Sequence, residues 1–251
     1  MNLEFFDEGP ALVIEGETRH LVVADLHFGI EADLAAHGMH FRSRSAARLK
    51  RLMAVIEAAQ PDALILLGDI KHSIPSLTRQ EYYEMPGILA DIRKRIPILV
   101  FPGNHDIGLE CFLSDGELQP KEGAVIDGVA YQHGHMIPDK SLAGKLIVIG
   151  HHHPLLLLKD EVGCALRAPA YLRASVDAEA LGMNEPAEGD TATRVLFVPA
   201  FNEIAGYDIL QIVNKPFAPL SKYIDKEGAE IILADGTLIG PLSAIESDAP
   251  D

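Results

Sequence analysis

Residues that can bind metal ions or move protons recur in five short segments of this sequence, and each segment follows an apolar run. Apolar runs of four or five residues bounded by turn residues are typical of buried strands. Open α/β sheets place their ligands at the carboxyl ends of such strands. The repetition therefore predicts one site to which every segment contributes. The segments are Asp25-Leu26-His27, Gly68-Asp69, Gly103-Asn104-His105-Asp106, His133-Gly134-His135 and Gly150-His151-His152-His153.

The carboxylate, amide and imidazole groups of these segments form a mixed oxygen and nitrogen donor set. Such a set suits borderline divalent metals such as Mn²⁺, Fe²⁺ or Zn²⁺. Seven ligands are too many for one such ion with an open position, but they suit two ions about 3.5–4 Å apart that share a carboxylate. Asp69, alone at its strand end, is the natural bridge. The seven residues are Asp25, His27, Asp69, Asn104, His133, His151 and His153.

Strand geometry adds an expectation about how these ligands divide between the two ions. Alternate residues of a strand point the same way, so Asp25 and His27 should face one metal. The same reasoning lets His151 and His153 project together and leaves His152 pointing elsewhere.

The elements that would position the site alternate between strands and helices in the first half of the chain. This alternation predicts βαβ units and a largely parallel sheet. Ser43 or Ser45 is the expected N-cap of the first helix, and Pro86 should mark a break or a fresh start in the second. Strands are expected at 11–15, 20–24, 63–67 and 98–101, and helices at 43–59 and 78–95.

After Gly123 the pattern changes to short strands separated by turn signals, which indicates a second, more antiparallel sheet. The chain 1–251 is expected to form a single domain, with a flexible loop at 182–193 and a frayed tail at 244–251. The strands expected in this half are 124–126, 129–132, 146–149, 155–158, 165–168, 195–198, 207–213, 229–233 and 237–239.

Composition narrows the class of protein. The formal net charge of -16 argues against a generally basic surface that coats nucleic acid. Apolar residues make up 48% of the chain, which is ample for a core, yet no stretch is long enough to span a membrane. The start of the chain has no basic signal-peptide region. Cys111 and Cys164 are too few for a disulfide framework, so a cytoplasmic protein with reduced thiols is expected.

The order of the motifs is similar to that of the calcineurin-like metallophosphoesterase superfamily: Asp-x-His, Gly-Asp, Gly-Asn-His-Asp, a lone His, and Gly-His-x-His. The resemblance runs from about His20 to Pro154. More narrowly, Gly68-Asp69-Ile70-Lys71-His72 and Pro199-Ala200-Phe201-Asn202 resemble SbcD-related phosphoesterases. The resemblance implies an α/β fold, a four-layer αββα sandwich of two mixed sheets, and an enzyme that hydrolyses phosphoric esters with metal ions.

The resemblance also implies roles for single residues. His105 would steady the phosphoryl oxygens or protonate the leaving group, and Asp106 would orient its imidazole. The cofactors would be two divalent metal ions, Mn²⁺ first, with Fe, Zn, Ni or Co as options. Asp25, His27 and His153 would hold the first ion, Asn104, His133 and His151 would hold the second, and Asp69 would bridge them.

The substrate class stays open between three alternatives. A phosphodiesterase is expected, and a nuclease related to SbcD-type DNA-processing enzymes is the first candidate. A phosphodiesterase of cyclic or short nucleotides is the second. The third, from another class, is a non-catalytic metal-binding module of a DNA-repair complex. A homodimer is one oligomeric state that the sequence leaves open.

A stripe of arginines could bear on this choice. Arg44, Arg48 and Arg51 share one face of the expected helix and could grip a nucleic-acid backbone. At a net charge of -16, the favoured interpretation is a solvated helix face or pairing of these arginines with the abundant surface carboxylates. The roles of His72, His135 and Asn202 are not assigned at this stage.

Overall fold

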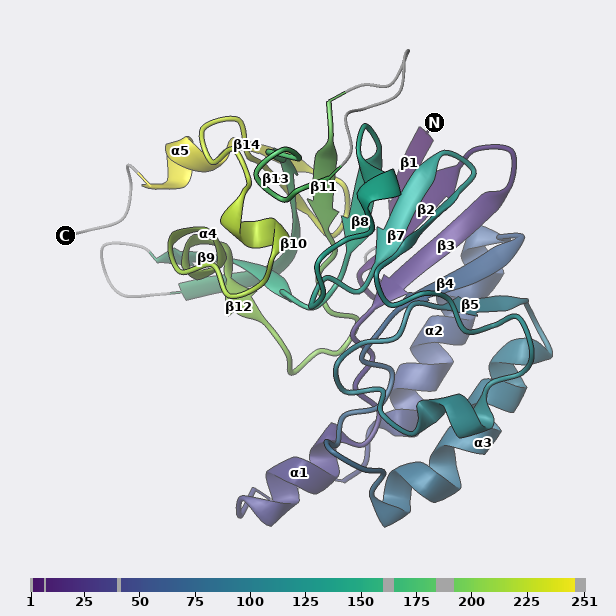
Figure 1. Ribbon diagram of the computed structural model, residues 1–251. Coiled ribbons are helices and arrows are strands. Elements are labelled where there is room, and N and C mark those ends of the chain that lie inside the picture. The colour runs from purple at the N-terminus through teal and green to yellow at the C-terminus, as the bar shows by residue number, and fades with distance from the viewer. Residues whose placement is uncertain (1, 7, 40–41, 160–164, 184–191, 247–251) are drawn as a thin grey trace.

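The computed structural model describes residues 2–6, 8–39, 42–159, 165–183 and 192–246 (Figure 1). Two mixed sheets pack face to face and share one apolar layer. Val22 and Ile65 of the first sheet meet Tyr131 and Val148 of the second in this layer. Helices cover the outer faces of both sheets, so the expected αββα sandwich is confirmed.

The first sheet has the strand order β1-β2-β3-β4-β5. Its first three strands are antiparallel, whereas β3, β4 and β5 run parallel, as the alternation of strands and helices predicts. β1 is an additional edge strand that the periodicity did not reveal. The strands are β1 (Asn2–Phe6), β2 (Ala11–Glu15), β3 (Arg19–Ala24), β4 (Ala63–Leu67) and β5 (Ile98–Val100).

The second sheet has the order β12-β9-β10-β11-β8-β7-β6, and β13 and β14 extend it from β10. Its central strands β7, β8 and β11 are parallel to one another, and most of the others are antiparallel to their neighbours. The strands are β6 (Ala124–Ile126), β7 (Val129–Gln132), β8 (Leu146–Ile149), β9 (Pro154–Lys159), β10 (Ala165–Ser175), β11 (Arg194–Phe197), β12 (Tyr207–Asp208), β13 (Glu230–Leu233) and β14 (Leu238–Pro241).

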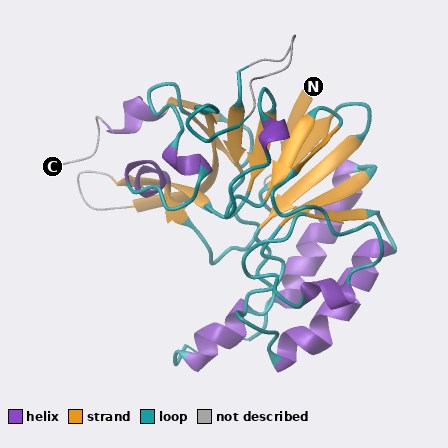
Figure 2. Cartoon of the chain, viewed as in Figure 1, coloured by secondary structure: helices purple, strands orange, loops and turns teal. Residues whose placement is uncertain are grey.

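The longer helices gather beside the first sheet, and shorter ones lie beside the second (Figure 2). Leu52 of α2 and Leu89 of α3 belong to the core on the outer face of the first sheet. Ile209 of α4 and Leu242 of α5 belong to the core on the outer face of the second. None of the described helices could cross a membrane. The α-helices are α1 (Ile30–Ala36), α2 (Ser45–Ala59), α3 (Arg79–Arg93), α4 (Ile209–Asn214) and α5 (Leu242–Glu246), and the 3-10 helices are η1 (Leu109–Phe112), η2 (Lys140–Leu142) and η3 (Leu220–Lys222).

Two expectations about helices are wrong. α3 runs without a break through Pro86, because its buried side, which includes Met85 and Leu89, packs on the sheet on either side of the proline. The N-cap of α2 is Arg44, with no side-chain hydrogen bond to the helix. The expected start of α3 is confirmed by a capping box in which Thr78 and Glu81 satisfy each other's backbone N–H groups.

The segment 207–213 was expected to be a strand, but only its first two residues are extended. The side chain of Asp208 accepts a hydrogen bond from the N–H of Leu210, and this cap starts the helix α4. A short apolar run does not distinguish a buried strand from a buried helix by periodicity alone. The cap decides the outcome here.

The expected flexible loop and frayed tail lie mostly outside the described residues, at 184–191 and 247–251. At the tail, residues 244–246 belong to α5, so its first residues are helical.

Candidate metal centre

Strands of both sheets deliver the candidate ligands at their carboxyl ends. Asp25 follows β3 directly, and Asp69 and Asn104 lie just beyond β4 and β5 of the same sheet. His133 follows β7, and His151 lies just beyond β8 of the second sheet. The sequence prediction that these segments converge on one place agrees with this arrangement.

A first group of four buried residues brings its donor atoms within 4.8 Å of one another: Asp25, His27, Asp69 and His153. The Nε2 atom of His153 lies 3.2 Å from Oδ1 of Asp25 and 3.4 Å from Nε2 of His27. His27 Nε2 also lies 3.7 Å from Oδ2 of Asp69. These atoms surround a space that a divalent cation could fill.

A second group consists of Asp69, His133 and His151. The Nε2 atom of His133 lies 3.5 Å from Oδ1 of Asp69 and 3.3 Å from Oδ1 of Asn104. Asp69 therefore presents Oδ2 to the first group and Oδ1 to the second. A carboxylate placed in this way is suited to bridge two cations.

Backbone carbonyls orient two of the imidazoles. The Nδ1 atom of His133 lies 2.8 Å from the carbonyl oxygen of Leu67, and Nδ1 of His105 contacts the carbonyl oxygen of His72. A carbonyl only accepts hydrogen bonds, so both Nδ1 atoms carry hydrogen. Because Nδ1 is occupied in this way, Nε2 is the atom that each imidazole turns toward the centre, which is the arrangement typical of metal-binding histidines.

The backbone is strained at these residues. Seven non-glycine residues of the described chain have a positive φ, and five of them belong to the centre: Asp25, His27, Asp69, His151 and His153, with φ between 44° and 67°. Each such residue costs about 1–3 kcal/mol and persists where the surrounding structure requires it, often at functional sites.

The left-handed backbone also overturns the expectation that His151 and His153 project together. His151 and His153 lie beyond the end of β8, in left-handed backbone conformations, so the alternation of strand side chains does not apply to them. They separate into different groups, His153 beside Asp25 and His151 beside Asp69. Asp25 and His27 do fall into the same group. They too have left-handed backbone conformations, so strand alternation is not the reason.

Two glycines allow the segments to approach closely. A Cβ atom on Gly103 would lie 2.1 Å from Oδ1 of Asp69, and a Cβ atom on Gly68 would lie 2.4 Å from Nδ1 of His133. Gly68 also has a φ of 70°, which favours glycine. Any larger residue at either position would displace a candidate ligand.

The electrostatics of the centre suit a cation. Burial lowers the pKa of His151 to about 2, and burial together with the neighbouring histidines lowers the pKa of His27 well below its ordinary value. These imidazoles are therefore neutral and keep lone pairs for ligation. The carboxylates of Asp25 and Asp69 are buried beside them. Neutral nitrogen donors around buried carboxylates fit borderline divalent metals.

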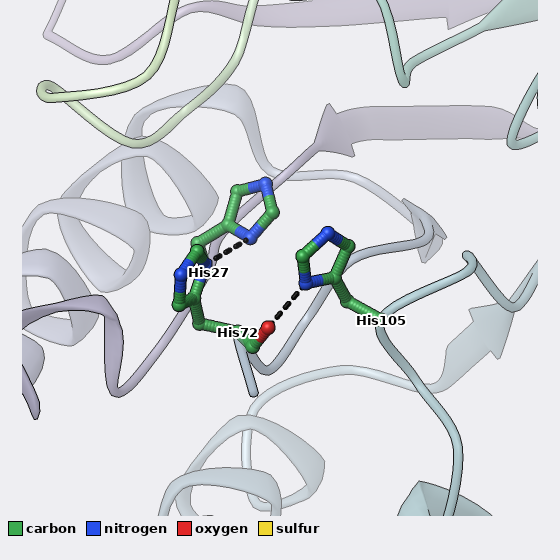
Figure 3. Close-up of side chains that lie close together, drawn as sticks. All are labelled: His27, His72 and His105. Carbon is green, nitrogen blue, oxygen red and sulfur yellow. Dashed lines mark hydrogen bonds between the residues drawn. The ribbon is translucent and has the colours of Figure 1, made fainter. Parts of the chain in front are cut away.

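His72 and His105 lie beside His27, a member of the first group (Figure 3). The Nδ1 atom of His72 lies 3.1 Å from Nδ1 of His27, and its ring stacks on that of His105 with 5.2 Å between centroids. His105 Nε2 lies 3.9 Å from Oδ2 of Asp69. His135 lies beside the second group, with its ring centroid 5.2 Å from that of His133.

The structure differs from the expectation for Asp106. Its buried carboxylate accepts hydrogen bonds from the backbone N–H groups of Ile70 at 2.8 Å, Lys71 at 3.3 Å and Gly103 at 2.8 Å. The imidazole of His105 is instead held by the carbonyl of His72. Asp106 therefore links the loops that follow β4 and β5. Three backbone N–H groups take up the hydrogen bonds of its carboxylate, and the imidazole of His105 bonds elsewhere.

Asn202 supports the first group from a distant part of the sequence. Its Nδ2 atom donates to the carbonyl oxygens of Leu26 at 3.1 Å and His27 at 3.4 Å, and its own N–H donates to the carbonyl of Asp25 at 3.2 Å. This buried amide holds the strained turn that carries Asp25 and His27. The motif around Asn202 was visible in the sequence, but its contact with this turn was not.

The arginines of the stripe form ion pairs with carboxylates. Arg44 pairs with Glu203 at 2.8 Å, and Arg51 lies 3.5 Å from the same carboxylate. Arg48 is fully buried and pairs with Glu31 at 3.1 Å and Glu203 at 3.4 Å. The pairing interpretation is therefore the one that agrees with the structure. Glu31 and Glu203 could not be assigned as partners from the sequence, since nothing local identifies them.

A sandwich of two mixed sheets, with buried carboxylates and imidazoles at the strand ends, defines the class of α/β metal-dependent hydrolases. Residues 18–169, more than half of the chain, match the calcineurin-like phosphoesterase family. The chain belongs to this family and is a metal-dependent phosphoesterase.

One solved structure extends the likeness of the fold beyond the matched region. Nuclease MPE from Pseudomonas putida has 20% sequence identity and a TM-score of 0.56, over 95% of this chain and 100% of that one. Yfce, a phosphoesterase from E. coli, has 13% identity and a TM-score of 0.35, over 56% of this chain and 73% of that one. No curated protein matches the chain significantly.

Proposed function

We propose that this protein hydrolyses phosphodiester bonds with two divalent cations, Mn²⁺ first among them. The observation that carries the proposal is the position of Asp69, which turns one carboxylate oxygen toward each group of donors. Asp25, His27 and His153 would complete the first cation site, and Asn104, His133 and His151 the second.

Bound cations would neutralise charge on the phosphoryl group and lower the pKa of a water molecule that attacks it. The contribution of His105 follows from its hydrogen bonding. Its Nδ1 is occupied by the His72 carbonyl, so Nε2 is the atom that would carry the second proton of an imidazolium and give it to the leaving oxygen. Asp106 would act indirectly, because it fixes the backbone of Gly103 next to the ligand Asn104.

A nucleic acid is the first substrate to test, because the similarly folded protein from P. putida is a nuclease. Short nucleotides are the second candidate. They are favoured by the ion pairs of Arg44, Arg48 and Arg51 with Glu203, which occupy the charges that would otherwise follow a long backbone.

The experiment uses metal-stripped protein to which Mn²⁺ is returned. End-labelled single- and double-stranded DNA, a cyclic nucleotide and bis-p-nitrophenyl phosphate are offered as substrates. We expect turnover that requires the metal and that Asp69→Ala abolishes. His105→Ala should lower kcat while retaining bound metal, which elemental analysis would check.

Each outcome distinguishes a class of function. Cleavage of DNA that His105→Ala loses supports a nuclease, whereas turnover of the small diesters alone supports a nucleotide phosphodiesterase. Metal bound at the centre without turnover of any of these diesters would overturn the proposal and favour a non-catalytic module.

A further inference from the structure

Two exposed aromatic rings lie beside the histidines of the centre. The ring centroid of Tyr207 is 5.9 Å from that of His153, and the centroid of Phe217 is 5.6 Å from that of His151. Tyr207 is 50% exposed and Phe217 is 48% exposed. Large apolar rings left open at the edge of a site often mark a ligand-binding surface.

The backbone fixes Tyr207 next to the centre. Its N–H donates to the carbonyl oxygen of His153 at 2.9 Å, and it begins β12, which pairs with β9 at Pro154. A ligand in contact with the Tyr207 ring would therefore keep a constant distance from the candidate metal ligand His153.

Phe217 packs against His152, the one histidine of the segment 150–153 that belongs to neither group of donors. Its ring lies 4.8 Å from that of His152 at an interplanar angle of 31°, and His152 is itself buried against Phe197. One side of Phe217 is thus supported by the core, and the ring is held in place with about half of its surface open. The ring centroids of Phe217 and Tyr207 are 5.8 Å apart.

A cavity of about 280 Å³ adjoins the two rings, close to the lower end of the range for ligand pockets. Gln211 and Lys215 of the α4 region line it together with Ile212. Lys215 makes no ion pair with any described residue, so its charge is available to a phosphate. Gln211 offers an amide that can donate and accept hydrogen bonds.

We propose that Tyr207 and Phe217 form a stacking platform for a nucleobase of the substrate, next to the phosphodiester held at the metal centre. The inference deepens the proposed function and depends on it for the position of the phosphate. Flat rings stack on any base, because every base has a π-face, and a cation at the rim matches the adjoining phosphate. The platform therefore recognises nucleotides as a class, with little preference among bases.

The test compares two single strands of equal length, oligothymidylate and the same strand with abasic residues. Both carry the same phosphates, so a difference between them measures contact with bases. Binding is measured by isothermal titration calorimetry on His105→Ala protein with Mn²⁺. We expect the abasic strand to bind about 5- to 150-fold more weakly, the range for loss of one stacked base.

Phe217→Leu and Tyr207→Leu, each in the His105→Ala protein, keep apolar bulk over His152 and His153 but remove the aromatic faces. We expect both to weaken binding of oligothymidylate and to bring its affinity close to that of the abasic strand. Tyr83→Leu, which removes a 69% exposed ring on α3, is the matched control and should keep the difference.

Equal binding of the two strands by the parent protein, or a preference that both leucine variants retain, would overturn the platform. Because binding is read without turnover, failure of the proposed hydrolysis is a separate result. Loss of cleavage in the Asp69→Ala test addresses the proposed function, whereas loss of the base preference addresses the platform alone.

Discussion

Replacing Arg48 with methionine should destabilise the fold far more than its position in an arginine stripe suggests. The guanidinium is fully buried, and its 3.1 Å contact is with Glu31, whose side chain is 2% exposed. Methionine fills similar space but leaves the carboxylate of Glu31 buried without its cation. Breaking such a pair from one side costs about 3–5 kcal/mol. That is a large share of the roughly 5–15 kcal/mol that stabilise a typical domain.

Urea unfolding followed by far-UV circular dichroism measures the loss, since the chain has no tryptophan to report it by fluorescence. Arg44→Met is the matched control. It breaks a 2.8 Å pair with Glu203 in which the arginine side chain is 56% exposed, so it should cost at most about 1 kcal/mol. Adding Glu31→Gln to Arg48→Met should recover most of the loss. Equal stabilities for Arg48→Met and Arg44→Met would refute the reasoning.

Two further predictions concern the loops around the centre. Gly103→Ala places a Cβ atom 2.1 Å from Oδ1 of Asp69 and should lower metal affinity or activity by about 10–100-fold. Gly87→Ala is the control and should change neither, because the space around Gly87 is open. Normal metal binding by Gly103→Ala would contradict this prediction. Burial opposes the charge of Glu81, but hydrogen bonds from Ser73, Thr78 and His72 outweigh it and lower its pKa below 4.5. This stabilisation is present above pH 4.5 and is lost as the pH falls through the folded pKa. The free energy of unfolding of the wild type should therefore exceed that of Glu81→Gln most above pH 4.5. A difference that grows at lower pH would refute this prediction.

The convergence of the site was predictable because each motif directly follows a buried strand. Apolar runs such as 63–67 identify parallel strands, and parallel strands bring their carboxyl ends to one edge. Asp25, Asp69 and His133 therefore meet as their positions along the chain indicate. The periodicity that reveals a strand ends with that strand, however. The division of His151 from His153 depends on left-handed turns beyond β8, which strand alternation does not describe.

The supporting contacts could not be predicted, because they join residues far apart in the chain. Arg48 and Glu203 are separated by 155 positions, and Asn202 reaches the carbonyl of Leu26 across 176. Composition supplies many carboxylates for each arginine and no reason to choose one. The contact expected between Asp106 and His105 is absent for a related reason. The two residues are adjacent in sequence, which suggested the contact, but the carboxylate of Asp106 accepts from backbone N–H groups such as those of Ile70 and Gly103 instead.

The donors of the centre come from both halves of the sandwich. Asp25, Asp69 and Asn104 follow strands of the first sheet, and His133 and His151 follow strands of the second. A cation bound here would thus act as a further cross-link between two layers that meet at this edge through apolar contacts and hydrogen bonds, such as that of His133 to the carbonyl of Leu67. Its binding free energy would add to their cohesion. The supply of metal would then govern how firmly the sandwich holds together, as well as whether it can act on a phosphoester.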